Sequence, residues 1–419
     1  MTILIRKAII TQPGSPFHGQ QKDILITGGI ILRIADNIID EADTVIEREG
    51  LQVSPGWVDI FAHFCDPGYE FKETLQTGAG AAAAGGYTHV FVLPNTNPVV
   101  HSKSQAEYIK EKSRSLPVNV HPIGAVSKNA EGKELAEMYD MFASGAIAFS
   151  DGINAVQSAG VLLKALQYVK AFDGVLIQIP QDKSIGTHGL MNEGVVSTRL
   201  GLPGKPVIAE EMMVARDIEL AEYAVSKLHF TGISTQRSVD HIKKAKEKGL
   251  QVSCSVTPYH LFFSDEDLLN YDTNLKVNPP LRTPENRQAL REAINNGWID
   301  CIASHHFPQE WDSKTCEFEY AGYGMIGLET AFGVAGAAGI SIERWVELCS
   351  INPRKIFGLP EIIIQEGEPA DLTLFNPGVS YLFEEKQIQS KSKNTPFTGK
   401  ELKGRVIGII NGEKVFLNT

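Results

Sequence analysis

The chain has 419 residues, 43% of them hydrophobic, with a formal net charge of −11 and a pI near 5.5. This acidic balance disfavours nucleic acid or an anionic membrane surface as the main partner. No apolar run reaches the roughly 18 residues of a membrane span, and the first residues lack the long apolar stretch of a signal peptide. Five scattered cysteines without a CxxC pair indicate reduced thiols, so the sequence predicts a cytoplasmic protein.

The N-terminal 52 residues show strand-like alternation broken by turns, most clearly over residues 23–35. Eight short β-rich runs follow and alternate with amphipathic helical patterns, which is typical of parallel βαβ units. The predicted strands are residues 57–64, 88–94, 118–125, 146–151, 174–180, 229–235, 250–258 and 299–306. The predicted helices are residues 103–114, 133–145, 158–172, 214–228, 238–249 and 285–297. Eight such units predict a closed (β/α)8 TIM barrel with its chemistry at the C-terminal strand ends.

The tail returns to β structure over residues 371–377 and 405–416, where Asn411-Gly412 is a strong hairpin signal. Two β-rich ends could pair into one small β-sandwich. The predicted domains are therefore a discontinuous β-sandwich, residues 1–52 and 365–419, and a barrel, residues 53–364.

The first barrel strand ends in the segment Asp59-Ile60-Phe61-Ala62-His63-Phe64-Cys65-Asp66-Pro67-Gly68. The chain here resembles dihydroorotases of the amidohydrolase superfamily, which carry Asp-x-His-x-His-x-Arg followed by an acidic-Pro-Gly turn. Side chains two apart on a strand face the same way, so the two histidines of that pattern can grip one metal ion. In this chain Phe61 stands at the first histidine position, His63 at the second, and Cys65 at the substrate-binding arginine.

Further motifs of the same family follow in order along the chain. They are residues 93–98 around Asn95, residues 148–151 ending in Asp151, residues 278–282 beginning with Asn278, and residues 323–332. The resemblance implies that Asn95 and Asn278 correspond to substrate contacts and that Asp151 corresponds to a metal-bridging acid. Their turn-rich, proline-flanked settings allow a second interpretation, in which both asparagines only hold loops and Asp151 caps a helix.

Other family positions are substituted. Ile179 and Gly232 stand where strands 5 and 6 end in histidines, with Gln178 beside Ile179. On strand 8, His305 replaces the general-base aspartate and Gln309 replaces a histidine that contacts the substrate carboxylate. A catalytic metal needs three or more protein ligands, and isoleucine, glycine and phenylalanine cannot coordinate. We therefore expect no metal cofactor, with His63, Asp151 and His305 as the weak candidates for one.

The Ser304-His305-His306 run is similar to the non-catalytic dihydroorotase-like subunits that accompany some bacterial aspartate carbamoyltransferases. This resemblance implies a pseudoenzyme of pyrimidine biosynthesis that acts as a scaffold or regulatory subunit, with aspartate carbamoyltransferase as partner and a homo-oligomeric state. Adjacent histidines on a regular strand point to opposite sides, so a second interpretation is that one of them only packs between the strand and a helix.

Two other functions stay open on the sequence. The first is an active dihydroorotase, closing carbamoyl-aspartate to dihydroorotate at a rearranged zinc site built from His63, Asp151 and one of the paired histidines. The second is hydrolysis of a different, uncharged cyclic amide, because Cys65 and Gln309 remove positive charge from the pocket. This second function also needs a water activator.

Overall fold

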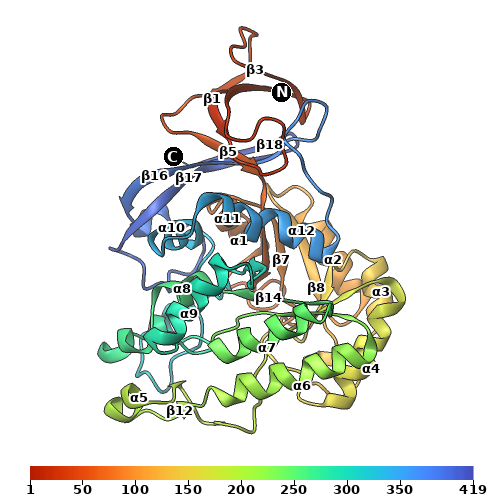
Figure 1. Ribbon diagram of the computed structural model, residues 1–419, viewed down its shortest axis with the longest axis vertical. Helices are drawn as coiled ribbons and strands as arrows, with labels where there is room; N and C mark the ends of the chain where they lie inside the picture. The colour runs from red at the N-terminus through yellow and green to blue at the C-terminus, as the bar shows by residue number, and fades with distance from the viewer. Residues whose placement is uncertain (419) are drawn as a thin grey trace.

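The computed structural model describes residues 1–418. A sheet built from both chain ends lies at one end of the molecule, and the helix-covered barrel lies below it (Figure 1). None of the helices within residues 1–418 is long and apolar enough to cross a membrane.

The two chain ends pair into one eight-stranded sheet with the order β18-β17-β16-β5-β1-β2-β3, and β4 adds to β1. Ile30 bridges Pro369 ahead of β16, so the sheet curls back around a core of isoleucine, leucine and valine side chains. The predicted hairpin at Asn411-Gly412 joins β17 to β18, with Gly412 at φ 61°. The strands are β1 (Thr2–Ile10), β2 (Gln21–Thr27), β3 (Ile30–Ala35), β4 (Thr44–Ile46), β5 (Gln52–Pro55), β16 (Asp371–Leu382), β17 (Glu401–Asn411) and β18 (Lys414–Leu417).

The second sheet contains eight parallel strands in chain order. Ala62 bridges His306 in parallel register, and the His63 N–H donates to the His306 carbonyl at 2.8 Å, which joins the two edges. The predicted parallel barrel, with a separate sheet from the chain ends, is therefore confirmed. Its strands are β6 (Trp57–Ala62), β7 (Tyr87–Val92), β8 (Asn119–Gly124), β9 (Ala148–Phe149), β10 (Val175–Gln178), β13 (Lys227–Phe230), β14 (Val252–Val256) and β15 (Cys301–Ile302).

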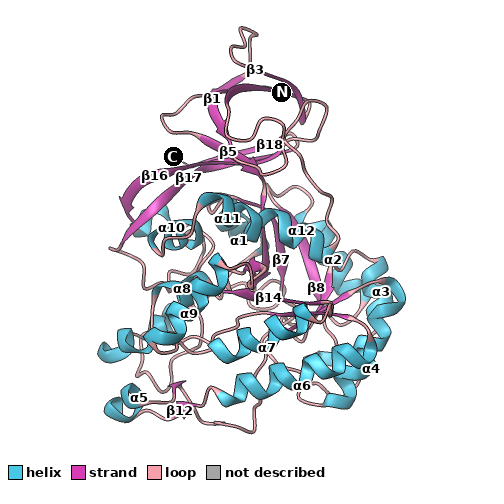
Figure 2. Ribbon diagram, in the orientation of Figure 1, coloured by secondary structure: helices cyan, strands magenta, loops and turns pink. Residues whose placement is uncertain are grey.

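Helices surround the barrel, as the colouring by secondary structure shows (Figure 2). They bury alanine, leucine, isoleucine and valine side chains against the strands. The helices that follow barrel strands are α1 (Leu75–Ala84), α2 (Lys103–Ser113), α3 (Met138–Ala143), α4 (Ala159–Val169), α6 (Ile208–Ala224), α7 (Gln236–Glu247), α8 (Pro258–Phe262) and α9 (Pro284–Asn295). After β15 come α10 (Ala331–Ala337), α11 (Ile342–Val346) and α12 (Asn352–Phe357).

Two predicted helices differ from those observed. The helix expected over residues 133–145 is confined to α3, because Leu135 bridges Ser127 in a backbone pairing that holds residues 133–137 as a loop. The helix expected over residues 214–228 begins at Ile208 and ends at Ala224. Val225 then adopts a left-handed conformation, and β13 begins at Lys227. Between β10 and α6 the chain also forms α5 (Val195–Leu200) and the two-strand pair β11 (Met191–Asn192) and β12 (Gly204–Lys205).

Candidate functional site

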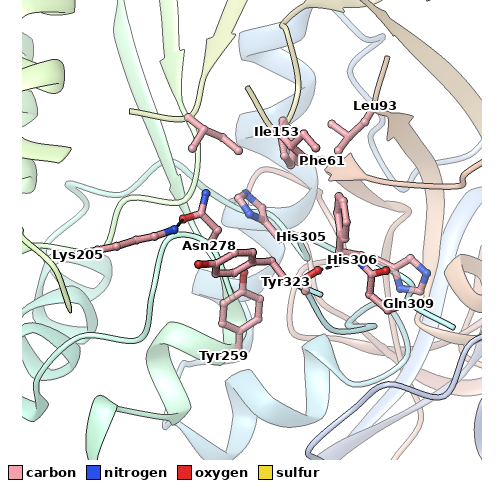
Figure 3. Close-up of a pocket in the computed structure, with 13 residues that line it drawn as sticks. Phe61, Leu93, Ile153, Lys205, Tyr259, Asn278, His305, His306, Gln309 and Tyr323 are labelled. Atoms are coloured by element: carbon pink, nitrogen blue, oxygen red, sulfur yellow. Dashed lines mark hydrogen bonds between the residues drawn. The ribbon is translucent and has the colours of Figure 1, made fainter. Parts of the chain in front are cut away.

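A cavity of about 310 Å³ lies at the carboxyl ends of the barrel strands (Figure 3). Active sites of parallel barrels occur at this end, which makes the cavity the candidate functional site. Lys205 and Asn278 lie on one side of it, and His306 and Gln309 lie on the other. Its lining residues are Phe61, Leu93, Ile153, Ile179, Lys205, Tyr259, Asn278, His305, His306, Phe307, Gln309, Tyr323 and Gly324.

Phe61 lies on β6 and lines the cavity, whereas His63, which follows the strand, does not line it. The Phe61 ring packs on the His305 ring with centroids 4.6 Å apart. The residue two before it, Asp59, is fully buried and accepts hydrogen bonds from the Ser304 N–H at 2.6 Å and the Ser304 hydroxyl at 2.8 Å. Asp59 therefore ties β6 to the chain after β15 and does not reach the cavity.

Both ring nitrogens of His63 are already hydrogen-bonded. Nε2 lies 3.0 Å from the Asn95 carbonyl, which can only accept, so Nε2 carries the proton. Nδ1 then accepts from the Cys65 N–H at 3.1 Å and lies 2.8 Å from the Cys65 sulfur. Burial lowers the pKa of His63 to about 4, which keeps the ring neutral. This histidine thus presents no free lone pair to a metal ion.

Asn95 and Asp151 brace neighbouring loops. The Asn95 side-chain amide donates to the Asp151 carbonyl at 3.0 Å, and its oxygen accepts from the Ile153 N–H at 3.0 Å. The Asp151 carboxylate accepts from the Ser127 N–H at 2.9 Å and the Ser127 hydroxyl at 2.5 Å. It does not cap the next helix, because the α4 N-cap is Ser158. Burial raises the pKa of Asp151, and the Ser127 hydrogen bonds oppose that shift.

The end of β10, the fifth strand of the barrel, supplies an apolar wall. Ile179 lines the cavity, while the Gln178 side chain turns away, donating to Asp217 at 3.1 Å and accepting from the Val156 N–H at 3.1 Å.

After β13, the sixth strand of the barrel, the chain has a glycine with no side chain to coordinate a metal. Gly232 has φ +70°, and a Cβ placed there would lie only 2.8 Å from Cε1 of His305. The His305 ring therefore occupies the space into which a side chain at position 232 would project.

His305 is held by a chain of hydrogen bonds through the barrel interior. Its Nε2 lies 2.8 Å from the Thr231 hydroxyl, which accepts from the Ser255 hydroxyl at 2.9 Å. Ser255 in turn lies 3.1 Å from Nε2 of His229, whose Nδ1 contacts Ser253 at 2.8 Å. Burial lowers the pKa of His305 to about 3, so it stays neutral near pH 7. It lacks the proton affinity of a general base at neutral pH.

On the far side of the cavity, the side chains of His306 and Gln309, which follow β15, contact other residues of the protein. Nδ1 of His306 accepts from the Gly327 N–H at 3.2 Å, and its Nε2 faces the Glu73 carboxylate at 3.5 Å, too long for a strong hydrogen bond. The Gln309 side chain accepts from Lys72 at 2.9 Å and donates to the Tyr323 carbonyl at 2.8 Å.

The residues present do not fit a catalytic zinc ion. No cluster of three or more His, Cys, Asp or Glu side chains within residues 1–418 is arranged to hold a metal. Of the three weak candidates, His63 has no free lone pair, both Asp151 oxygens accept hydrogen bonds from Ser127, and one nitrogen of His305 is hydrogen-bonded to Thr231. A catalytic zinc site needs three protein ligands and an open position.

The cavity also contains a cationic side chain, Lys205, that the sequence did not predict. Lys205 lines the cavity from β12, 8% exposed, and donates to the Asn278 side-chain oxygen at 2.9 Å. The Asn278 amide donates to Gln181 at 2.8 Å, and the Lys205 ammonium lies 4.4 Å from the Tyr323 ring centroid. Lysine side chains are usually on the surface, and no motif marks this one in the connection between β10 and α6.

The chain thus combines a closed parallel barrel, a cavity at the carboxyl ends of its strands and a second sheet built from both chain ends. A family described as dihydro-orotase-like matches residues 50–238. The dihydroorotase of Syntrophus aciditrophicus is 39% identical over 424 residues, covering 99% of each chain, and that of Caldanaerobacter subterraneus is 42% identical over 413, covering 97% of this chain and 95% of the relative. The chain therefore belongs to the dihydroorotase family.

Solved structures share the fold at lower identity. An L-hydantoinase (dihydropyrimidinase) from Arthrobacter aurescens superposes with a TM-score of 0.85 at 24% identity, covering 99% of this chain and 96% of its own. A D-hydantoinase superposes with a TM-score of 0.84 at 20% identity, covering 100% and 95%. These likenesses establish the barrel with its attached sheet as a known architecture.

Proposed function

We propose that this chain is a non-catalytic member of the dihydroorotase family, acting in pyrimidine biosynthesis as a scaffold or regulatory subunit of aspartate carbamoyltransferase. The observation that carries the loss of catalysis is the state of His63, the one histidine retained in the first-strand motif. Both its ring nitrogens are hydrogen-bonded within the protein. With Phe61, Ile179 and Gly232 at the other ligand positions, the cavity offers no group that could lower the pKa of a bound water.

The second candidate function is active dihydroorotase chemistry. It is favoured by the names of the relatives, which are called dihydroorotases at 38–43% identity over most of this chain. This function would require His63 to leave Asn95 and Cys65, and His305 to leave Thr231, before a metal could be held. Hydrolysis of a different cyclic amide would require the same changes.

We expect the protein, purified without chelators, to contain less than about a tenth of an equivalent of zinc, manganese, iron or cobalt. Cyclisation of carbamoyl-aspartate should not exceed the rate without protein, even with added zinc or manganese. Plasma mass spectrometry and an absorbance assay for dihydroorotate measure the two quantities.

The control is His63→Ala, which should leave both results unchanged. One equivalent of metal together with turnover that His63→Ala abolishes would establish the active enzyme instead.

The partnership is tested separately. Aspartate carbamoyltransferase from the same cell, mixed with this protein, is expected to elute as one larger complex in size-exclusion chromatography with light scattering. The same measurement on the protein alone gives its oligomeric state. Separate elution of the two proteins at micromolar concentrations would contradict the scaffold role. It would not affect the conclusion that the protein lacks catalytic activity.

A further inference from the structure

The cavity at the barrel mouth contains a buried cation without a counter-ion. The Lys205 ammonium donates to the neutral oxygen of Asn278, and it forms no salt bridge with any residue of the described chain. The charged groups that act on it are themselves cations, Arg282 and Lys276. Arg282 has Glu210 as a partner at 3.6 Å, so its charge is already balanced.

A second buried lysine reinforces the positive field. Lys276 is 2% exposed, and its ammonium lies 5.0 Å from the centroid of the Tyr323 ring that Lys205 also faces. Its hydrogen bonds go to the backbone carbonyls of Phe318 and Glu319, at 2.7 and 2.9 Å. The Tyr323 ring faces both ammonium groups and stabilises them in part. Burial of the Lys205 cation without an anionic partner still remains unfavourable. An anion bound beside Lys205 would reduce the free-energy cost of burying this ammonium.

The rest of the cavity suits a flat, apolar body. Phe61, Phe307 and Tyr259 contribute aromatic surfaces, and Leu93 and Ile179 contribute aliphatic ones. Lys205 and Asn278 lie at one side of this space, opposite Gln309 (Figure 3). A volume of about 310 Å³ admits a molecule with one or two rings.

We propose that the cavity binds, without reaction, a small aromatic carboxylate whose carboxylate pairs with Lys205 and whose ring lies between the apolar walls. A monoanion balances the single ammonium that reaches the cavity, and the Asn278 side chain positions that ammonium. This proposal rests on the proposed function, since a site without a water activator leaves its ligand unchanged.

The test uses the full-length protein and two probes of nearly the same shape, benzoate and benzamide, in isothermal titration calorimetry near pH 7. Benzoate is expected to bind with a dissociation constant of about 1 mM or tighter, and benzamide about tenfold more weakly. Lys205→Met should weaken benzoate binding by about tenfold or more. Lys103→Met, which removes a lysine exposed on α2, should leave it unchanged.

A second variant locates the ring. Ile179→Trp fills part of the apolar space of the cavity and should abolish benzoate binding while the Lys205 side chain is unchanged. Equal affinity for benzoate and benzamide, or full binding by Lys205→Met or by Ile179→Trp, would overturn the proposal.

The proposed function fails by a different measurement. Metal-dependent turnover of carbamoyl-aspartate would refute a non-catalytic role even if benzoate bound as expected. If neither benzoate binding nor turnover of carbamoyl-aspartate is observed, the proposed ligand class is wrong and the non-catalytic function stands.

Discussion

Gly232→Ala is expected to lower the free energy of unfolding by about 2–5 kcal/mol, a large effect for one methyl group. Part of this arises because Gly232 has φ +70°, where an L side chain is strained. The larger part comes from the 2.8 Å approach of the new Cβ to Cε1 of His305. That ring cannot easily move away, since it is hydrogen-bonded to Thr231 and packed on Phe61. Urea denaturation followed by circular dichroism measures the change.

Gly201→Ala separates the two contributions. Gly201 has nearly the same φ, +68°, but a Cβ there would meet nothing within 4 Å. It should therefore show the backbone strain alone, about 1–2 kcal/mol. Equal losses for the two variants would contradict a steric conflict between position 232 and His305.

A double-mutant cycle tests the contact itself. His305→Ala removes the obstructing ring, so Gly232→Ala should destabilise the His305→Ala background by about 1–3 kcal/mol less than the wild type. Strict additivity would show that the two positions are independent. Coupling of the expected size would show that His305 occupies the space of a side chain at position 232.

Asp371→Asn is expected to destabilise the protein by about 3–5 kcal/mol, because it leaves a buried arginine without its counter-ion. The Asp371 carboxylate, at the start of β16, contacts Arg354 of α12 at 2.6 Å and His89 of β7 at 3.0 Å. These contacts join the barrel to the terminal sheet. Asp173→Asn, which breaks an exposed pair with Lys227, is the control and should cost less than about 1 kcal/mol.

The effect of Asp371 should depend on pH in a defined direction. Burial alone raises its pKa, but the His89 hydrogen bond and the Arg354 charge hold the pKa of this carboxyl well below the usual 3.8. A depressed pKa contributes stability that is fully present above 3.8 and is lost as the pH falls toward the folded-state value.

Unfolding curves of the wild type and Asp371→Asn should therefore be far apart at pH 7 and approach each other below about pH 4. A constant difference from pH 7 to pH 3 would contradict the assignment. Partial recovery of stability in Asp371→Asn combined with Arg354→Met would confirm that the unpaired arginine is the cause.

Much of this architecture could be predicted because it follows from local pattern. Eight short β-rich runs from Trp57 to His306 specify buried strands, and the apolar periodicity of the segments between them specifies helices packed on one face. The ordered family motifs predicted the barrel mouth, and residue type alone shows that Phe61, Ile179 and Gly232 have no side chain that can coordinate a metal.

The ends of two helices could not be predicted from local sequence patterns. The helix expected over residues 133–145 was shortened by a backbone pairing between Ser127 and Leu135, a contact that local propensity does not encode. The helix expected over residues 214–228 likewise ends at Ala224, where Val225 adopts a left-handed conformation before β13 begins at Lys227.

Tertiary structure determines which side chains of the cavity are free, which are hydrogen-bonded and which are buried. The sequence shows that His63 is present, but its availability to a metal depends on Asn95, 32 residues away, and on the turn that places Cys65 against its ring. Position 232 reads as a missing ligand, yet only the folded barrel shows that His305 fills the same space. Lys205 carries no motif, and it becomes a buried cation only because distant segments bring Asn278 and Tyr323 around it. Strand and helix patterns act over a few neighbouring residues, whereas burial, hydrogen-bond partners and unpaired charge are set by segments far apart in the chain.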